Sequence, residues 1–135
     1  LGDNTGEIVL DRLLLEQLAP RHITFAARGG PILNDATPDD ARAAGIHEHA
    51  EIIDTGAPSA GVPLDRVSRR FLDAFESADL IISKGQANFE SLCETTRENI
   101  FFLYTIKCRL VARYTNTKVG DIMLSQGGHV KLYGL

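Results

Sequence analysis

Three short segments of the sequence contain side chains that could bind a metal ion and a phosphate group. The first holds Asp3 and Asn4, the second Asp35, and the third Lys84. A hard cation such as Mg²⁺ or Mn²⁺ prefers carboxylate and amide oxygens, usually one or two carboxylates together with water and a substrate phosphate. A lysine between an apolar strand and a glycine can present its ammonium group to a phosphate. These residue types therefore predict a site for a divalent cation and a phosphorylated ligand.

Each of these residues also has an ordinary structural explanation. Asn4 and Glu7 are spaced like a capping pair at the start of a helix. Asp35 could be a turn residue ahead of Thr37, and Lys84 could be a solvated surface lysine. Placement favours the site, because all of these residues follow apolar strands or open helices, where backbone N–H groups also attract anions.

The elements that must position these side chains alternate between helix and strand. Apolar residues spaced three and four apart, including Val9, Leu10 and Leu13, predict a helix from near Thr5 with that apolar face toward the core. Further helices are expected to start near residues 38, 65, 88 and 107, with Phe71 and Phe75 in the core. Strands are expected over residues 22–27, 51–54, 80–83 and 99–105, with 80–83 covered on both faces.

This alternation predicts a three-layer, Rossmann-like α/β domain with a mostly parallel sheet and helices on both faces. In such folds ligands bind beyond the carboxyl ends of the strands, which is where the candidate residues lie. A terminal hairpin is expected from residues 122–124 and 130–133.

Composition limits the classes of protein that the chain can represent. Its 135 residues, 44% of them hydrophobic, fit a single domain spanning residues 1–135. A net charge of −4 gives no reason to expect nucleic acid or an anionic membrane as partner. No apolar run approaches the roughly 20 residues that cross a bilayer. The absence of a leader-like start and the presence of only two cysteines, expected as free thiols, favour a cytoplasmic protein.

Several rival sites do not fit the spacing of the candidate residues. A haloacid-dehalogenase phosphatase would carry a second aspartate where Thr5 stands. A P-loop would place its lysine after a glycine, whereas Lys84 precedes Gly85. A dinucleotide or methyl-donor cofactor would require a glycine-rich turn after the first strand. His47 and His49 are expected to be solvated rather than metal-bound.

Three motifs in the sequence match a known family in the same order. They are GDNTGEIV at residues 2–9, RGGPILNDAT at 28–37 and ADLIISKGQANFE at 78–90. Over about residues 1–125 the chain resembles the DUF89, or damage-control phosphatase, family in its stand-alone archaeal and bacterial form. The resemblance implies a metal-dependent phosphatase that acts on small phosphorylated metabolites. A ligand set of two aspartates and an asparagine accepts Mn, Mg, Co or Ni with little discrimination, so the ion is not specified.

By this resemblance the metal ligands are Asp3, Asn4 and Asp35, and Lys84 holds the substrate phosphate. The catalytic set would be Asp3, Asp35 and Lys84. The resemblance also places Glu7, Asn34 and Asn88 near the substrate. Arg28 lies beside the Asp35 loop, where it would contact either the phosphate or an acidic side chain.

Family members carry a helical region and a strand ahead of the Asp-Asn pair, whereas here only Leu1 and Gly2 precede Asp3. The chain is therefore expected to be the site-bearing portion of a longer protein. The alternative function is a non-catalytic domain, or inactive fragment, that binds metal and a phosphorylated ligand. Attack by water and a covalent intermediate on Asp3 both remain open. The organic part of the substrate, a sugar phosphate, a nucleotide or a phosphopantetheine-like compound, is not specified.

Overall fold

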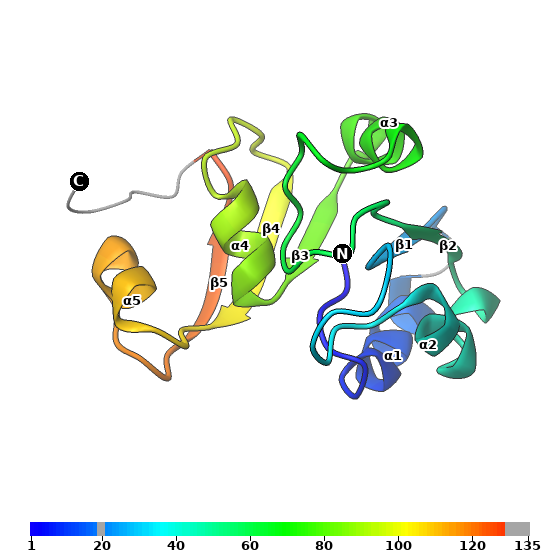
Figure 1. Cartoon of the computed structure of the whole chain (residues 1–135), viewed down its shortest axis with the longest axis horizontal. Helices are drawn as coiled ribbons and strands as arrows, with labels where there is room; N and C mark the ends of the chain where they lie inside the picture. Colours follow the sequence, from blue (N-terminus) through cyan, green and yellow to red (C-terminus); the bar gives the residue numbers. More distant parts are fainter. Residues whose placement is uncertain (19–20, 129–135) are drawn as a thin grey trace.

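The computed structural model describes residues 1–18 and 21–128 and has the expected α/β alternation (Figure 1). The helices are α1 (Ile8–Leu18), α2 (Pro38–Ala43), the 3-10 helix η1 (Ile46–Glu48), α3 (Arg69–Ser77), α4 (Gln86–Leu92) and α5 (Arg109–Thr115). The strands are β1 (Thr24–Ala27), β2 (Glu51–Asp54), β3 (Ile81–Lys84), β4 (Ile100–Thr105) and β5 (Ile122–Gln126).

The strands form two separate sheet portions. β1 pairs with β2 in parallel, β3 pairs with β4 in parallel, and β5 pairs antiparallel with β4. The amino group of Leu1 donates to Ile82 O at 2.7 Å, and Gly2 N–H donates to Ala26 O at 3.0 Å. The first two residues therefore lie between β3 and β1 (Figure 1). A groove of about 760 Å³, lined by α1, α3, β1 and β3, occupies the same gap.

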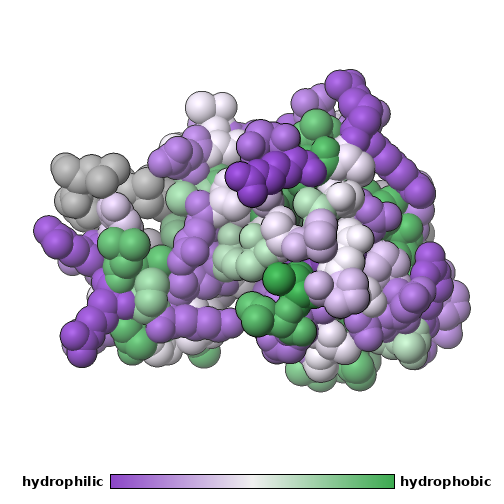
Figure 2. Space-filling model, in the orientation of Figure 1, coloured by the Kyte–Doolittle hydropathy of each residue, from purple (hydrophilic) through white to green (hydrophobic). Residues whose placement is uncertain are grey.

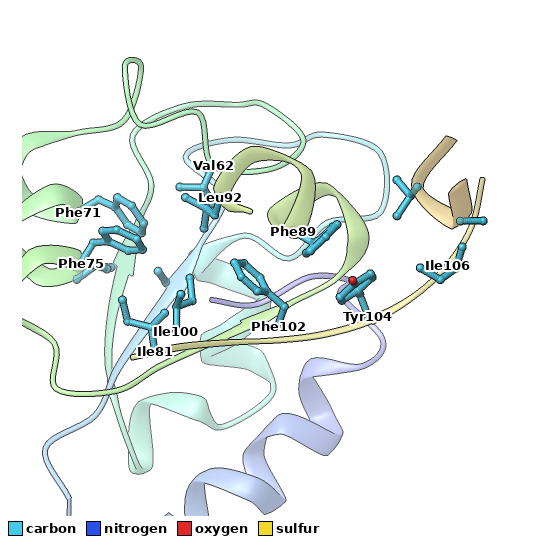
Figure 3. Close-up of a cluster of buried hydrophobic side chains, with 14 residues drawn as sticks. Val62, Phe71, Phe75, Ile81, Phe89, Leu92, Ile100, Phe102, Tyr104 and Ile106 are labelled. Carbon is cyan, nitrogen blue, oxygen red and sulfur yellow. The ribbon is translucent and has the colours of Figure 1, made fainter. Parts of the chain in front are cut away.

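The larger hydrophobic cluster joins α3, α4 and α5 to both sheet portions. Its centre is aromatic: Phe89 of α4 stacks on Tyr104 at 4.2 Å between ring centroids and meets Phe102 edge-on at 5.3 Å (Figure 3). Phe71 and Phe75 of α3 are buried in this cluster, as their spacing predicts.

A second cluster packs α1 against the other face of β1. Ile8 and Leu15 of α1 contact a group that includes Phe25 and Ala27. Ala26, between them in β1, points to the larger cluster because successive strand residues face opposite sides. Helices therefore cover both faces of the β1–β2 sheet, and the three-layer arrangement is confirmed there.

The predicted orientation of the first helix is wrong. The residues expected in the core are exposed: Val9 by 56%, Leu10 by 66% and Leu13 by 56%. The residues of α1 that are buried are Ile8, Asp11 and Leu15. The helix starts three residues later than predicted, and Asp11 turns inward because it forms an ion pair with Lys84. The partly buried pair of Asp11 with Lys84, which no apolar periodicity reveals, thus helps to set the rotation of this helix together with the packing of Ile8 and Leu15.

The strands of the second sheet portion are not covered on both faces. In β3, Ile81 and Ser83 are buried, whereas Ile82 and Lys84 are partly exposed, and β4 alternates in the same way. One face of this portion packs on the aromatic cluster, and the other is only partly covered by the described residues.

Some element boundaries also differ from expectation. α3 starts at Arg69 because the Ser68 hydroxyl accepts the Phe71 N–H at 3.2 Å and so caps the helix. Residues 122–124 belong to β5 and pair with β4, while residues 130–133 lie outside the described part of the chain.

The described helices include none that is long and apolar enough to span a membrane. The face shown in Figure 2 is mostly hydrophilic, with apolar side chains in separate small patches.

Candidate functional site

Backbone hydrogen bonds bring Asp3, Asn4 and Asp35 together. Ala36 N–H donates to Asp3 O at 2.8 Å, and Thr5 N–H donates to Asn34 O at 2.9 Å. These bonds form an isolated antiparallel bridge between Asn4 and Asp35. The start of the chain is thereby fixed against the loop that follows β1, and the predicted convergence of these two motifs occurs.

Arg28 forms a buried ion pair with Asp35. Its Nε donates to Asp35 Oδ2 at 2.6 Å, and only 2% and 8% of the two side chains are exposed. Its Nη1 donates to Gly61 O at 3.0 Å. Of the two roles that the sequence left open for Arg28, the structure shows pairing with an acid.

Gly85, between β3 and α4, touches the carboxylate of Asp3. A Cβ added at Gly85 would overlap the Asp3 side chain, and the φ of Gly85 is +88°. Glycine is needed here for both reasons, because other residues rarely adopt this backbone conformation. The backbone of the third motif, at Gly85, is therefore in contact with the Asp3 side chain of the first motif.

The environment of Asp3 disfavours its charge. Burial, followed by the nearby charge of Glu7, raises the pKa of Asp3 above its ordinary value, and Asp35 acts in the same direction. The positive charges of Lys107 and Arg28 oppose this shift. A cation bound beside Asp3 would relieve the same unfavourable interactions.

Lys84 is held by two carboxylates. Its Nζ donates to Glu7 Oε1 and to Asp11 Oδ1, both at 2.5 Å. Burial acts to lower the pKa of Lys84, but the hydrogen bonds to Asp11 and Glu7 outweigh it and raise the pKa. The lysine predicted to hold phosphate is thus next to the site, but its charge is already compensated.

Asn4 connects the Asp3 carboxylate to this lysine cluster. Its Nδ2 donates to Asp3 Oδ2 at 2.9 Å and to Glu7 Oε2 at 3.0 Å. Burial acts to raise the pKa of Glu7, but the bonds from Lys84 and Asn4 lower it. The Asn4 amide N–H groups therefore orient two carboxylates, and the alternative role of its side chain as a helix cap is not observed among the described residues.

The two other predicted asparagines occupy different environments. Asn88 is fully buried, and its Nδ2 donates to Gly2 O at 3.1 Å and Lys84 O at 2.7 Å. It holds the backbone beneath the site. The Asn34 residue is exposed, and its carbonyl accepts the Thr5 N–H.

Lys107 is a site residue that the sequence argument missed. It is exposed, two residues beyond β4, and its charge acts to lower the pKa of both Asp3 and Glu7. Its backbone N–H donates to Gln86 Oε1 at 2.6 Å, which ties it to the start of α4. Across residues 1–18 and 21–128, no ion pair involves the Lys107 ammonium group. The signal available in the sequence was its position just after an apolar strand, as for Lys84.

The oxygen donors near Asp3 fit a hard divalent cation. Asp3 and Asp35 supply carboxylates, and Asn4 supplies an amide oxygen. Among the described residues, neither Asn4 Oδ1 nor Asp35 Oδ1 accepts a hydrogen bond, so both are available. The described part of the chain contains no cluster of three or more His, Cys, Asp or Glu side chains suited to a metal ion. The candidate site, as far as the described residues define it, consists of the two carboxylates of Asp3 and Asp35 and the amide oxygen of Asn4.

Comparisons with known proteins identify relatives over most of the chain. The sequence model of the Damage-control phosphatase ARMT1-like domain matches residues 1–123. A damage-control phosphatase of Pyrococcus horikoshii is 43% identical over 126 residues, which cover 91% of this chain and 44% of that protein. A damage-control phosphatase of Archaeoglobus fulgidus is 40% identical, with the same two coverages.

A solved structure is also similar to this chain. The crystal structure of a DUF89 family protein from Pyrococcus horikoshii superposes with a TM-score of 0.90 at 41% sequence identity. The superposition covers 93% of this chain and 45% of that protein. The chain therefore spans less than half the length of the relatives that it matches.

Proposed function

Because the chain belongs to the damage-control phosphatase ARMT1-like (DUF89) family, we propose that it carries the site of a divalent-metal-dependent phosphatase. The reaction is hydrolysis of phosphate monoesters of small metabolites. The observation that supports this proposal most directly is the convergence of Asp3, Asn4 and Asp35 beside Lys84 and Lys107.

Asp3, Asn4 and Asp35 would hold the divalent ion, for which Mn, Mg, Co and Ni are the candidates. When bound, the ion withdraws charge from the phosphoryl oxygens. Lys107 makes the first contact with the phosphate, because its ammonium is unpaired among the described residues and lies near Asp3. Lys84 is paired with Glu7 and Asp11, so its contribution to offsetting the charge that accumulates during transfer depends on how far the phosphate displaces these carboxylates.

The charges of the site imply an order of binding. Asp3, Glu7, Asp11 and Asp35 contribute four carboxylates, against the three cations Arg28, Lys84 and Lys107. Before the metal binds, the cluster has a formal charge of −1, which repels a phosphate dianion. A bound divalent ion would change this formal charge to +1, so we expect the metal to bind before the phosphate.

The full reaction belongs to the longer protein that the lengths of the relatives indicate. Its organic substrate is a small phosphorylated metabolite, and we place the protein in the cytoplasm. The pairing of Lys84 with Glu7 and Asp11 supports a second candidate, a domain that binds the metal and a phosphorylated ligand without turnover.

Phosphate release from p-nitrophenyl phosphate, with and without each of the four metals, separates the two candidates. We expect metal-dependent release that Asp3→Ala and Asp35→Ala abolish. Asp39→Ala is the matched control, because the Asp39 side chain is 95% exposed on α2 and, within the described residues, its ion pair is with Arg42. Metal binding without release, in both this chain and the longer protein, would favour the binding domain. Absence of metal binding would contradict both candidates.

A further inference from the structure

We propose that Arg28 is a positioning residue for the metal site: it holds Oδ2 of Asp35 and so leaves Oδ1 available to bind the ion, without touching the substrate. This inference rests on the proposed function. The inference assigns Arg28 to metal binding rather than to phosphate binding, because Arg28 positions Asp35, a proposed ligand of the ion.

The burial of Arg28 separates it from any substrate. Only 2% of its side chain is exposed, and Nη2 is buried without a partner among the described residues. A phosphate that binds from the solvent cannot reach the guanidinium group of Arg28 unless the loop that carries Asp35 moves away. Arg28 therefore acts through Asp35, its nearest charged neighbour.

The guanidinium is itself anchored. While Nε binds Asp35 Oδ2, Nη1 donates to Gly61 O at 3.0 Å. Gly61 is tightly packed on α4: a Cβ at this position would lie 2.5 Å from Ala87 O and 2.7 Å from Ser91 Oγ. The Asp35 carboxylate is thus linked, through the planar guanidinium and the Gly61 carbonyl, to the loop that packs on α4.

The positive charge of Arg28 also helps to hold the Asp35 carboxylate in position. The carboxylates of Asp3 and Asp35 repel each other, since the charge of Asp35 acts to raise the pKa of Asp3. The charge of Arg28 acts to lower the same pKa. A permanent positive charge behind the two carboxylates keeps them side by side before the ion arrives.

Arginine and lysine differ in the feature that this role requires. The guanidinium presents donors in a fixed planar fork, whereas a lysine ammonium is a single point of charge on a flexible chain. Arg28→Lys retains the charge but cannot bind both Asp35 and Gly61 in the observed geometry. This substitution therefore separates geometry from charge.

The test is the affinity of the chain for Mn²⁺, measured by electron paramagnetic resonance of the free ion. We expect Arg28→Lys and Arg28→Gln each to weaken binding at least ~10-fold, since a misplaced ligand removes one of the metal contacts. Arg42→Lys and Arg42→Gln are matched controls, because Arg42 pairs with Asp39 at the exposed surface, and their affinity should equal that of the parent chain.

Parental affinity in Arg28→Lys would overturn the positioning role while leaving the metal site intact. If the parent chain itself binds no Mn²⁺, the proposed metal site fails, and the inference fails with it. At saturating Mn²⁺, the affinity of Arg28→Lys for inorganic phosphate should match the parent, and a loss there would show that Arg28 contacts the ligand.

A measurement on the parent chain does not depend on the folding of variants. The Nε–H resonance of Arg28 should stay protected from solvent exchange when Mg²⁺ saturates the site, because the bond to Asp35 Oδ2 persists. Exchange typical of a free guanidinium in the Mg²⁺-bound chain would overturn the inference.

Discussion

Asp3 carries a charge that the folded chain accommodates poorly until a cation binds. Since its pKa is raised, the folded state binds the proton more tightly than the unfolded state does. The contribution of Asp3 to stability therefore falls as the pH rises from the ordinary aspartate pKa of 3.8 through the higher pKa of Asp3 in the folded chain. At neutral pH the metal-free chain is less stable than it would be with a neutral side chain here.

Asp3→Asn is accordingly expected to raise the melting temperature of the metal-free chain at pH 7. Burial of the charge and its repulsion by Glu7 and Asp35 are removed together. The same variant should lose its stabilisation by Mn²⁺, which for a functional site is about 2.7 kcal/mol at 100-fold excess over Kd. Thermal melts with EDTA and with Mn²⁺ measure both effects. A lower metal-free melting temperature would contradict the argument.

A side chain at position 85 would disturb a residue far away in the sequence. Gly85→Ala should destabilise the chain by more than ~2 kcal/mol, because the strain of a positive φ costs roughly 1–2 kcal/mol and the collision with Asp3 adds to it. It should also abolish Mn²⁺ binding, because the displaced carboxylate is a proposed ligand.

Gly120→Ala is the control for this prediction. Gly120 has a φ of +98°, but no heavy atom lies within 4 Å of the Cβ that would be added. Its cost should therefore be that of the backbone alone, with Mn²⁺ binding unchanged. Equal losses in urea unfolding for the two variants would show that contact with Asp3 is unimportant.

At the scale of elements, the capping box of α2 fixes the loop that carries Asp35. Thr37 Oγ1 accepts the Asp40 N–H at 3.3 Å, and Asp40 Oδ2 accepts the Thr37 N–H at 2.9 Å. Thr37→Ala should cost about 1 kcal/mol of stability and also weaken Mn²⁺ binding. Ser68→Ala, which removes the cap of α3 away from the site, should cost about as much with no effect on Mn²⁺. Calorimetry on both variants provides the comparison.

The sequence predicts elements better than it predicts their orientation. Thr37 followed by Pro38 identified α2, and the apolar run of residues 80–82 identified β3, because both signals are local. The rotation of α1 depends on the pair of Asp11 with Lys84, which are 73 residues apart. No local pattern contains that information.

The candidate site shows the same division. Its residues could be collected because Asp3, Asp35 and Lys84 each end or follow an apolar strand or open a helix. The partners of these residues could not be predicted from the sequence. The ion pair of Arg28 with Asp35, the pairing of Lys84 with carboxylates and the nearness of Lys107 to Asp3 all depend on tertiary contacts.

For the whole molecule, the surface of α1 predicts association. Leu10 and Leu13 are 66% and 56% exposed, next to Val9 at 56%. Contiguous exposed apolar side chains favour contact between molecules. We expect the isolated chain to self-associate with rising concentration, and Leu10→Glu with Leu13→Lys to suppress this without loss of helical circular dichroism. Sedimentation equilibrium measures the difference, and monomeric behaviour of the parent chain at high concentration would contradict the prediction.

The contact between Asp3 and Gly85 joins residues at opposite ends of a long stretch of chain. Closing such a loop is entropically costly, so contacts of this kind tend to form late as a protein folds. The site for an ion bound by Asp3 and Asp35 would then be complete only after the folding transition state. Mn²⁺ should therefore slow unfolding and leave the folding rate nearly unchanged, so that the ion acts as a latch on the finished structure.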